Sequence, residues 1–105
     1  RYENSDRLEE GACHGKPARW VVLGGRTPGG AEAAVAVLDH PSNPRHPTTW
    51  YVDKGMPYFS PAPIFRKPME IAPGGTLTLR YKVLVIAGRA DPAGIEREWR
   101  AFAAE

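Results

Sequence analysis

Alternating hydrophobic and polar residues predict several short β-strands in this chain. The clearest run is Thr76–Ile86, in which the odd-numbered side chains are mostly apolar and the even-numbered ones begin polar and end with Leu84 and Ile86. A period of two is typical of a strand whose two faces meet different surroundings. We expect the first half of this strand to be solvated on one face and the second half to be covered on both.

Four other segments have the composition of strands, with β-branched and aromatic residues bounded by Gly or Pro. Ala31–Leu38 is expected to lie antiparallel to Ala18–Gly24. Ile64–Phe65 is expected at a sheet edge, because the prolines around it exclude a central position. In chain order the segments are Ala18–Gly24, Ala31–Leu38, Thr48–Val52 and Ile64–Phe65.

One helix is predicted near the C-terminal end, over residues 91–104. Asp91 is a favourable N-cap residue, and Pro92 suits the first helical position. Three apolar side chains at i, i+4 and i+7 share one face and would cover the second half of the last strand. They are Ile95, Trp99 and Phe102.

These elements predict a mainly β fold, an antiparallel β-sandwich with one short C-terminal helix. Eleven Pro and eleven Gly in 105 residues favour short strands joined by many turns. The length fits a single domain, residues 1–105, with a polar, turn-rich loop leading into it over residues 1–17. Because there is no initial Met and Arg1–Glu10 lacks apolar periodicity, we expect a C-terminal fragment of a longer chain.

Composition and charge exclude several partners and sites. A net charge of +2 with scattered Lys and Arg makes no nucleic-acid footprint, and the single cysteine, Cys13, excludes an internal disulfide. No apolar run reaches the roughly 18 residues that span a bilayer, and no signal-peptide pattern is present. We expect no nucleic-acid or membrane partner. The compartment stays open with the cytoplasm favoured, since an export signal would lie upstream of Arg1.

The densest polar chemistry lies in and beside the loop Pro41–Pro47. Its three prolines fix φ and remove backbone donors, so neither a helix nor a paired strand runs through it. One interpretation is a rigid crossover whose polar groups satisfy its own backbone. The other is a binding or catalytic site on a stiff support.

His40 is the candidate general acid or base, since an imidazole titrates near pH 6.5. Asp39 is the second candidate catalytic residue, which would orient an imidazole or serve as a carboxylate partner. Neighbours on a strand point to opposite faces, so His46 is the expected imidazole to contact Asp39. A sugar site needs polar groups for hydroxyls and aromatic faces for the ring. The candidate substrate-binding residues are Asn43, Arg45, His46, Trp50 and Tyr58.

Structural roles remain open for the same residues. His40 would cap the strand end, and Arg45 would brace loop carbonyls or a carboxylate such as Glu32. A metal site of Asp39, His40 and His46 is a further alternative, but three ligands so close need a sharp turn that the prolines restrict. We therefore assign no metal ligand, and the sequence names no cofactor.

Four segments carry a resemblance to an uncharacterised bacterial family labelled "methane oxygenase PmoA" or PmoA-like. The resemblance spans about Gly15 to Phe102, and its most specific part is the Asp-His-Pro-x-Asn-Pro-Arg loop. It implies part of a larger antiparallel β-sandwich reminiscent of galactose-mutarotase-like folds, with a second His-rich segment upstream. By association it implies carbohydrate metabolism. The segments are Ala18–Trp20, Leu38–Trp50, Pro73–Tyr81 and Gly88–Pro92.

Two functions of different classes follow as hypotheses. The first is that the chain is part of a carbohydrate-active enzyme, which acts on a sugar or keto-sugar by proton transfer. This hypothesis predicts that His40, Arg45 and Trp50 converge on one concave surface. The second is a non-catalytic module that binds a glycan or packs against a partner domain, such as the missing N-terminal part of the chain. It predicts an exposed apolar face. The family label suggests a third, a metal-dependent oxygenase.

Overall fold

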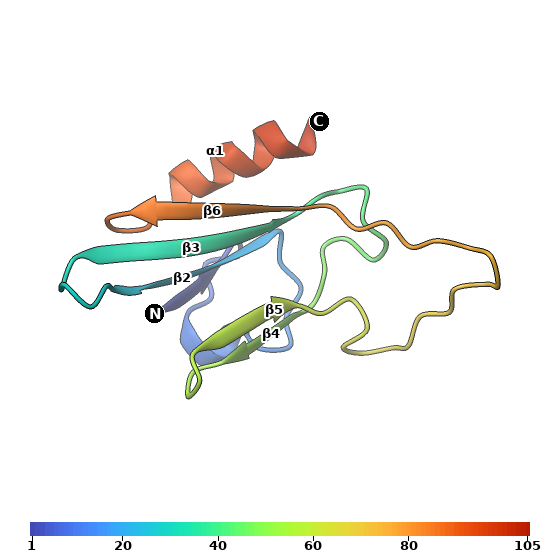
Figure 1. The fold of residues 1–105 in the computed structure, drawn as a ribbon, viewed down its shortest axis with the longest axis horizontal. Helices are drawn as coiled ribbons and strands as arrows, with labels where there is room; N and C mark the ends of the chain where they lie inside the picture. The colour runs from blue at the N-terminus through green and yellow to red at the C-terminus, as the bar shows by residue number, and fades with distance from the viewer.

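The computed structural model describes residues 1–105 and contains two antiparallel sheets and one α-helix (Figure 1). The larger sheet has the order β1-β2-β3-β6, and the smaller pairs β4 with β5. The predicted mainly β class with a short C-terminal helix is confirmed. The elements are β1 (Tyr2–Asn4), the 3-10 helix η1 (Glu10–Cys13), β2 (Trp20–Arg26), β3 (Glu32–Asp39), β4 (Trp50–Asp53), β5 (Tyr58–Pro61), β6 (Tyr81–Ala87) and α1 (Pro92–Ala103).

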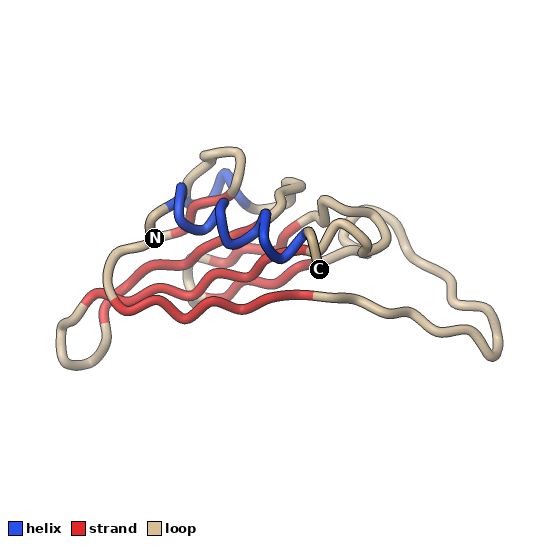
Figure 2. Tube along the Cα trace, turned by 90° about the horizontal axis from the view of Figure 1, so that it is seen from above, coloured by secondary structure: helices blue, strands red, loops and turns tan.

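Strands β2 and β3 form the centre of the larger sheet and are antiparallel, as predicted. Even-numbered side chains of both strands point to one face and odd-numbered ones to the other. Helix α1 lies over the even-numbered face (Figure 2). The core between helix and sheet contains Trp20, Val22, Ala34, Ala36, Leu38, Ile95 and Phe102.

Helix α1 begins as the sequence predicted, with Asp91 as N-cap and Pro92 in the first turn. A second contact fixes the helix on the sheet: Glu96 accepts hydrogen bonds from Trp20 Nε1 at 2.9 Å and Arg19 Nη2 at 2.8 Å. Burial alone would raise the pKa of Glu96, but these hydrogen bonds and nearby positive charge lower it overall. Neither helix of the chain has the length and apolar character that a membrane crossing requires.

The smaller sheet packs on the odd-numbered face, mainly over β1 and β2. The Tyr2 hydroxyl ties the two sheets together by donating to the carbonyls of Asp53 at 2.9 Å and Tyr58 at 3.0 Å. This second core contains Tyr2, Cys13, Ala18, Val21, Trp50 and Val52.

The expectation of a simple loop over residues 1–17 is wrong, because β1 and η1 lie within it. Strand β1 pairs with β2, and Asn4 is fully buried, where its Oδ1 accepts from the backbone of Asp6 and Leu8. A strand of three residues is too short to show an alternating pattern. Its stability comes from contacts with β2 that are distant in sequence.

The predicted edge strand at Ile64–Phe65 is also wrong, and β5 (Tyr58–Pro61) takes that role. A turn after β4, where Asp53 Oδ1 accepts from Gly55 N at 2.8 Å, reverses the chain before Ile64 is reached. Pro61 is the last residue of β5, which is an edge strand of its two-stranded sheet and therefore tolerates a proline. Residues 62–80 form a connection without helix or strand.

Strand β6 is shorter than the predicted Thr76–Ile86. Its first residue, Tyr81, pairs with Asp39 at the end of β3, so the residues before Arg80 have no strand beside them on that side. Helix α1 covers its even-numbered face, but on the other face Val83 is 60% and Val85 83% exposed. The second half of the strand is therefore covered on one face only, contrary to expectation.

Candidate functional site

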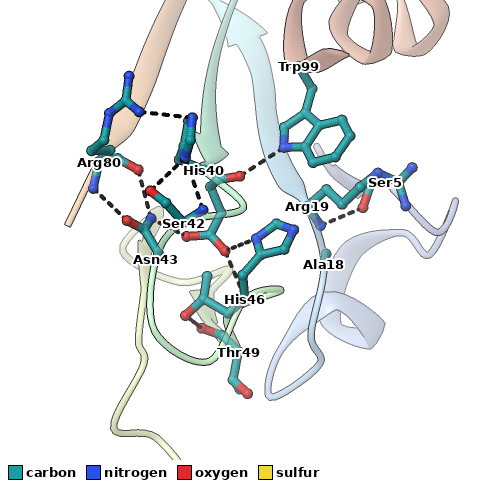
Figure 3. Close-up of polar contacts among 12 residues, drawn as sticks. Ser5, Ala18, Arg19, His40, Ser42, Asn43, His46, Thr49, Arg80 and Trp99 are labelled. Carbon is teal, nitrogen blue, oxygen red and sulfur yellow. Dashed lines mark hydrogen bonds and ion pairs between the residues drawn. The ribbon is translucent and has the colours of Figure 1, made fainter. Parts of the chain in front are cut away.

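A fully buried carboxylate organises the loop that follows β3 (Figure 3). Asp39 accepts hydrogen bonds from Nδ1 of His46 at 2.6 Å, Nδ2 of Asn43 at 2.7 Å and the backbone N–H of Thr48 at 3.0 Å. We call these four residues the Asp39 cluster. Strand geometry predicted His46 as the imidazole beside Asp39, and the structure places it there.

Asn43 joins this cluster to the chain that enters β6. Its Nδ2 also donates to the Arg80 carbonyl at 2.7 Å, and its Oδ1 accepts from the Arg80 N–H at 2.6 Å. Burial raises the pKa of the adjacent Tyr81, and the negative charge of Asp39 raises it further. Asn43 therefore acts as a clamp between two segments 37 residues apart.

His40 is buried outside the Asp39 cluster, and both of its ring nitrogens are engaged. Nδ1 accepts from the Ser42 N–H at 3.0 Å, and Nε2 lies 3.0 Å from Arg80 Nη1 and 3.3 Å from the Glu105 carbonyl. The ring also meets Phe102 edge to face. This arrangement matches the strand-capping alternative.

His46, unlike His40, has a ring nitrogen without a hydrogen-bond partner in the protein. Its ring stacks on Trp99 with a centroid distance of 5.9 Å and an angle of 8°, while Trp99 Nε1 donates to the Asp39 carbonyl at 2.8 Å. Nε2 of His46 has no hydrogen-bond partner within the protein, and the side chain is 16% exposed. Arg19 lies over the Trp99 ring, 5.3 Å from its centroid.

Arg45 holds the long connection instead of facing His40. Its φ of 65° turns the loop, and its guanidinium donates to the carbonyls of Pro63 at 2.9 Å and Pro68 at 2.8 Å, and to that of Lys67. Of the two structural roles expected for Arg45, the structure has the bracing of loop carbonyls, and it pairs Glu32 with Arg26 instead.

Two aromatic candidates lie apart from the loop. Trp50 is fully buried in the second core, and its Nε1 donates to the Ala18 carbonyl at 2.9 Å. Tyr58 is exposed at the far end of the β4–β5 hairpin, against Tyr51. The expected convergence of His40, Arg45 and Trp50 on one concave surface is therefore wrong.

The main cavities lie elsewhere. One of about 500 Å³ adjoins Arg26, Glu32 and Arg89, and one of about 350 Å³ lies between Leu23 and Pro57, and none of the predicted site residues lines either. No group of three or more His, Cys, Asp or Glu side chains is arranged to hold a metal ion. Asp39, His40 and His46 thus do not form a three-ligand set.

Sequence reasoning missed Arg80 and assigned Trp99 to packing alone. Arg80 contacts His40 and Asn43, and Trp99 fixes both Asp39 and His46. No local pattern marks either residue, because their partners are far away along the chain.

A second candidate surface is apolar. Val35, Val83 and Val85 are exposed on the odd-numbered face, and Val35 pairs directly with Val85 across β3 and β6. We call these three residues the open face. The two-stranded sheet is too narrow to cover it, since that sheet packs mainly on β1 and β2.

A comparison with known proteins identifies the family of this chain but assigns it no activity. A family model described as "Family of unknown function (DUF6807)" matches residues 1–100. No curated protein and no solved structure matches the chain. Neither a PmoA-like label nor a link to sugars follows from this description. The matched region covers nearly the whole chain, which therefore belongs to DUF6807, a family of unknown function.

Proposed function

We propose that this chain is a non-catalytic β-sandwich module whose open face packs against a further β-sheet. The observation that carries the proposal is the exposure of three neighbouring valines, Val35 at 38%, Val83 at 60% and Val85 at 83%. Contiguous exposed apolar residues on a sheet mark a surface for association. The partner expected from the sequence is the N-terminal part of a longer chain.

The polar groups of the loop support the same proposal. Asp39, Asn43, His40 and Arg45 all bind groups of the protein itself, so they position the loop and β6. Their contacts resemble those of a rigid corner more than those of a site prepared for a ligand. The corner holds β6 in register and thereby presents Val83 and Val85.

Burying a fully exposed valine side chain contributes about 1.5–3 kcal/mol. Val85 and Val83, at 83% and 60% exposed, would therefore supply most of the driving force for packing, and Val35, at 38%, would supply less. The cavity of about 350 Å³ that Leu23, Val35 and Pro57 line marks the border where the smaller sheet ends. A further sheet placed beside β5 would fill this border and cover the open face. The four-stranded sheet would then be covered on both faces, as in a complete sandwich.

Association of the purified chain tests the proposal. An uncovered apolar face should make the chain self-associate, and Val35→Lys should weaken that association by about tenfold or more, because packing would bury a charge. Sedimentation velocity over a range of concentrations measures the effect. The matched control is Ile64→Lys, which adds the same charge at an exposed residue of the connection.

Equal association of wild type and Val35→Lys would contradict the packing role, as would a chain that stays monomeric at every concentration. Circular dichroism and the unfolding midpoint of each variant establish that folding is retained. Val35 is already partly exposed, so a lysine there can extend its amine into water in the free chain.

A second candidate function is proton transfer on a sugar or keto-sugar, which the pairing of Asp39 with His46 favours. The carboxylate at 2.6 Å from Nδ1 would keep the proton on that nitrogen and leave the lone pair on Nε2. Nε2 would then take a proton from a sugar hydroxyl, or from a carbon beside a carbonyl, and return it. Asp39 would stabilise the transient imidazolium, and Trp99 beside it would offer an aromatic face.

Simple sugars test this second function. If it holds, the chain accelerates the mutarotation of α-D-glucose or hydrogen exchange of D-fructose in D₂O, and His46→Gln lowers that rate by about 10²-fold or more. Polarimetry and proton NMR follow the two reactions. The same change at His40 distinguishes the two imidazoles, since a loss there alone would return the role to His40. A binding shift in tryptophan fluorescence without any rate would instead indicate a glycan-binding module.

A further inference from the structure

Strand β6 forms an unpaired edge of the larger sheet. Its only partner is β3, and Figure 2 shows no element beyond it on the other side. Native sheets protect such edges with proline, bulges or outward charges. Strand β6 contains no proline, and its one charge, Lys82, lies on the helix face beside Glu98 at 3.3 Å.

The backbone groups that face this edge can be identified. The Arg80 carbonyl accepts from His40 N, and Gly88 N donates to the Glu32 carbonyl, so even-numbered residues point toward β3. In an antiparallel strand the direction alternates from one residue to the next. The N–H and C=O groups of the odd-numbered residues therefore point outward. These residues are Tyr81, Val83, Val85 and Ala87.

The sequence pattern indicates a longer strand than the fold pairs. Residues 76–80 continue the alternation of β6, yet they remain outside any ladder and residues 76–78 are exposed. They lie beyond the end of β3, so only a strand added on the outer edge would pair with them. The extended pattern and the outward groups thus indicate the same missing partner.

We propose that the missing partner is a second copy of this chain, paired antiparallel through β6 about a two-fold axis at Val83. The outward groups restrict the register, because only residues that both point outward exchange hydrogen bonds. An axis at Tyr81 would set Arg80 opposite the second copy's Lys82, and an axis at Lys82 would oppose two lysines. Like charges placed directly opposite are destabilising.

An axis at Val83 removes these conflicts and opposes apolar residues on one face. Val83 meets its own copy, Tyr81 meets the second copy's Val85, and Lys82 meets the second copy's Leu84. An axis at Leu84 also avoids like charges but shortens the ladder, since the chain turns at Gly88. The product is one continuous sheet of eight strands with both helices on one face and both open faces on the other.

This register predicts one specific cross-link. Paired residues that exchange hydrogen bonds lie about 5.5 Å apart at Cα, within the range that a disulfide spans. Val83→Cys would meet its own copy at that separation. Val85→Cys would be displaced from its copy by four residues, about 13 Å along the strand.

The test compares Val83→Cys with Val85→Cys in the full chain under mild oxidation, with dimers counted by intact mass. We expect at least about fivefold more disulfide dimer from Val83→Cys, although Val85 is the more exposed side chain at 83% against 60%. The native Cys13 stays silent, because it is fully buried and burial raises its pKa to about 11. Equal cross-linking of the two variants, or none from Val83→Cys, would overturn the proposal.

Two further variants keep the result interpretable. Tyr81→Cys with Val85→Cys should form two disulfides per dimer, which checks the register if Val83→Cys folds poorly. The second variant combines Val83→Cys with Val35→Lys in one chain. If it still forms the disulfide dimer, the β6 edges pair independently of the open face. If Val35→Lys abolishes association and Val83→Cys forms no cross-link, the chain packs through the open face and the proposed pairing of β6 edges is rejected.

Discussion

Replacing Asp39 by alanine is expected to lower the free energy of unfolding by about 3–5 kcal/mol, because the change leaves two buried donors and one half-buried imidazole without their acceptor. The donors belong to His46, Asn43 and Thr48, all within 3.0 Å of the carboxylate. Losing them frees the loop and weakens the attachment of β6 through Asn43. Urea unfolding followed by tryptophan fluorescence measures the effect.

The matched control is Asp53→Ala. Asp53 also accepts a backbone hydrogen bond, from Gly55 at 2.8 Å, but it lies in the exposed turn of the hairpin. Its loss should cost only about 1 kcal/mol. If the two variants had the same stability, the Asp39 cluster would not be the structural centre of this corner.

Replacing Trp50 by alanine is expected to destabilise the chain by about 3–5 kcal/mol, since it removes a large side chain from the second core. Trp50 is 0% exposed and packs between the sheets near Val21 and Phe59. Its removal also leaves the Ala18 carbonyl without the donor that now lies at 2.9 Å. Thermal and urea unfolding provide two independent measurements.

Tyr51→Ala serves as the control, because Tyr51 is the next residue on β4, points to the opposite face and is 39% exposed. We expect its cost to be well below that of Trp50→Ala. A Trp50 variant with unchanged stability and reduced sugar binding would restore the substrate-binding role that the sequence predicted. The buried position of the indole indicates the opposite result.

The Asp39 cluster and the open face act together in this fold. The cluster fixes where β3 ends and β6 begins, through Asn43 on Arg80 and Trp99 on the Asp39 carbonyl. Because β6 starts there, its odd-numbered valines reach the surface beside Val35. A loop rich in functional groups thus contributes to assembly through the strand it positions.

The candidate site was only partly predictable. The preference of Asp39 for His46 followed from the opposite directions of neighbouring strand residues, which is a local rule. The burial of Trp50 and the clamp on Arg80 depend on segments 32 and 37 residues away, so no local pattern reveals them. The same limit explains why a loop of five polar groups resembled a site before its partners were known.

Local patterns in the sequence determined the central strands, the rigid loop and the C-terminal helix, because alternation, proline and the Asp91 N-cap act through neighbouring residues. Tertiary structure alone decided that β1 exists, that β5 replaces the strand expected at Ile64–Phe65, and that β6 begins at Tyr81. It also decided which valines stay exposed. The physical reason is that a strand needs a partner and a side chain needs a cover, and both come from distant parts of the chain.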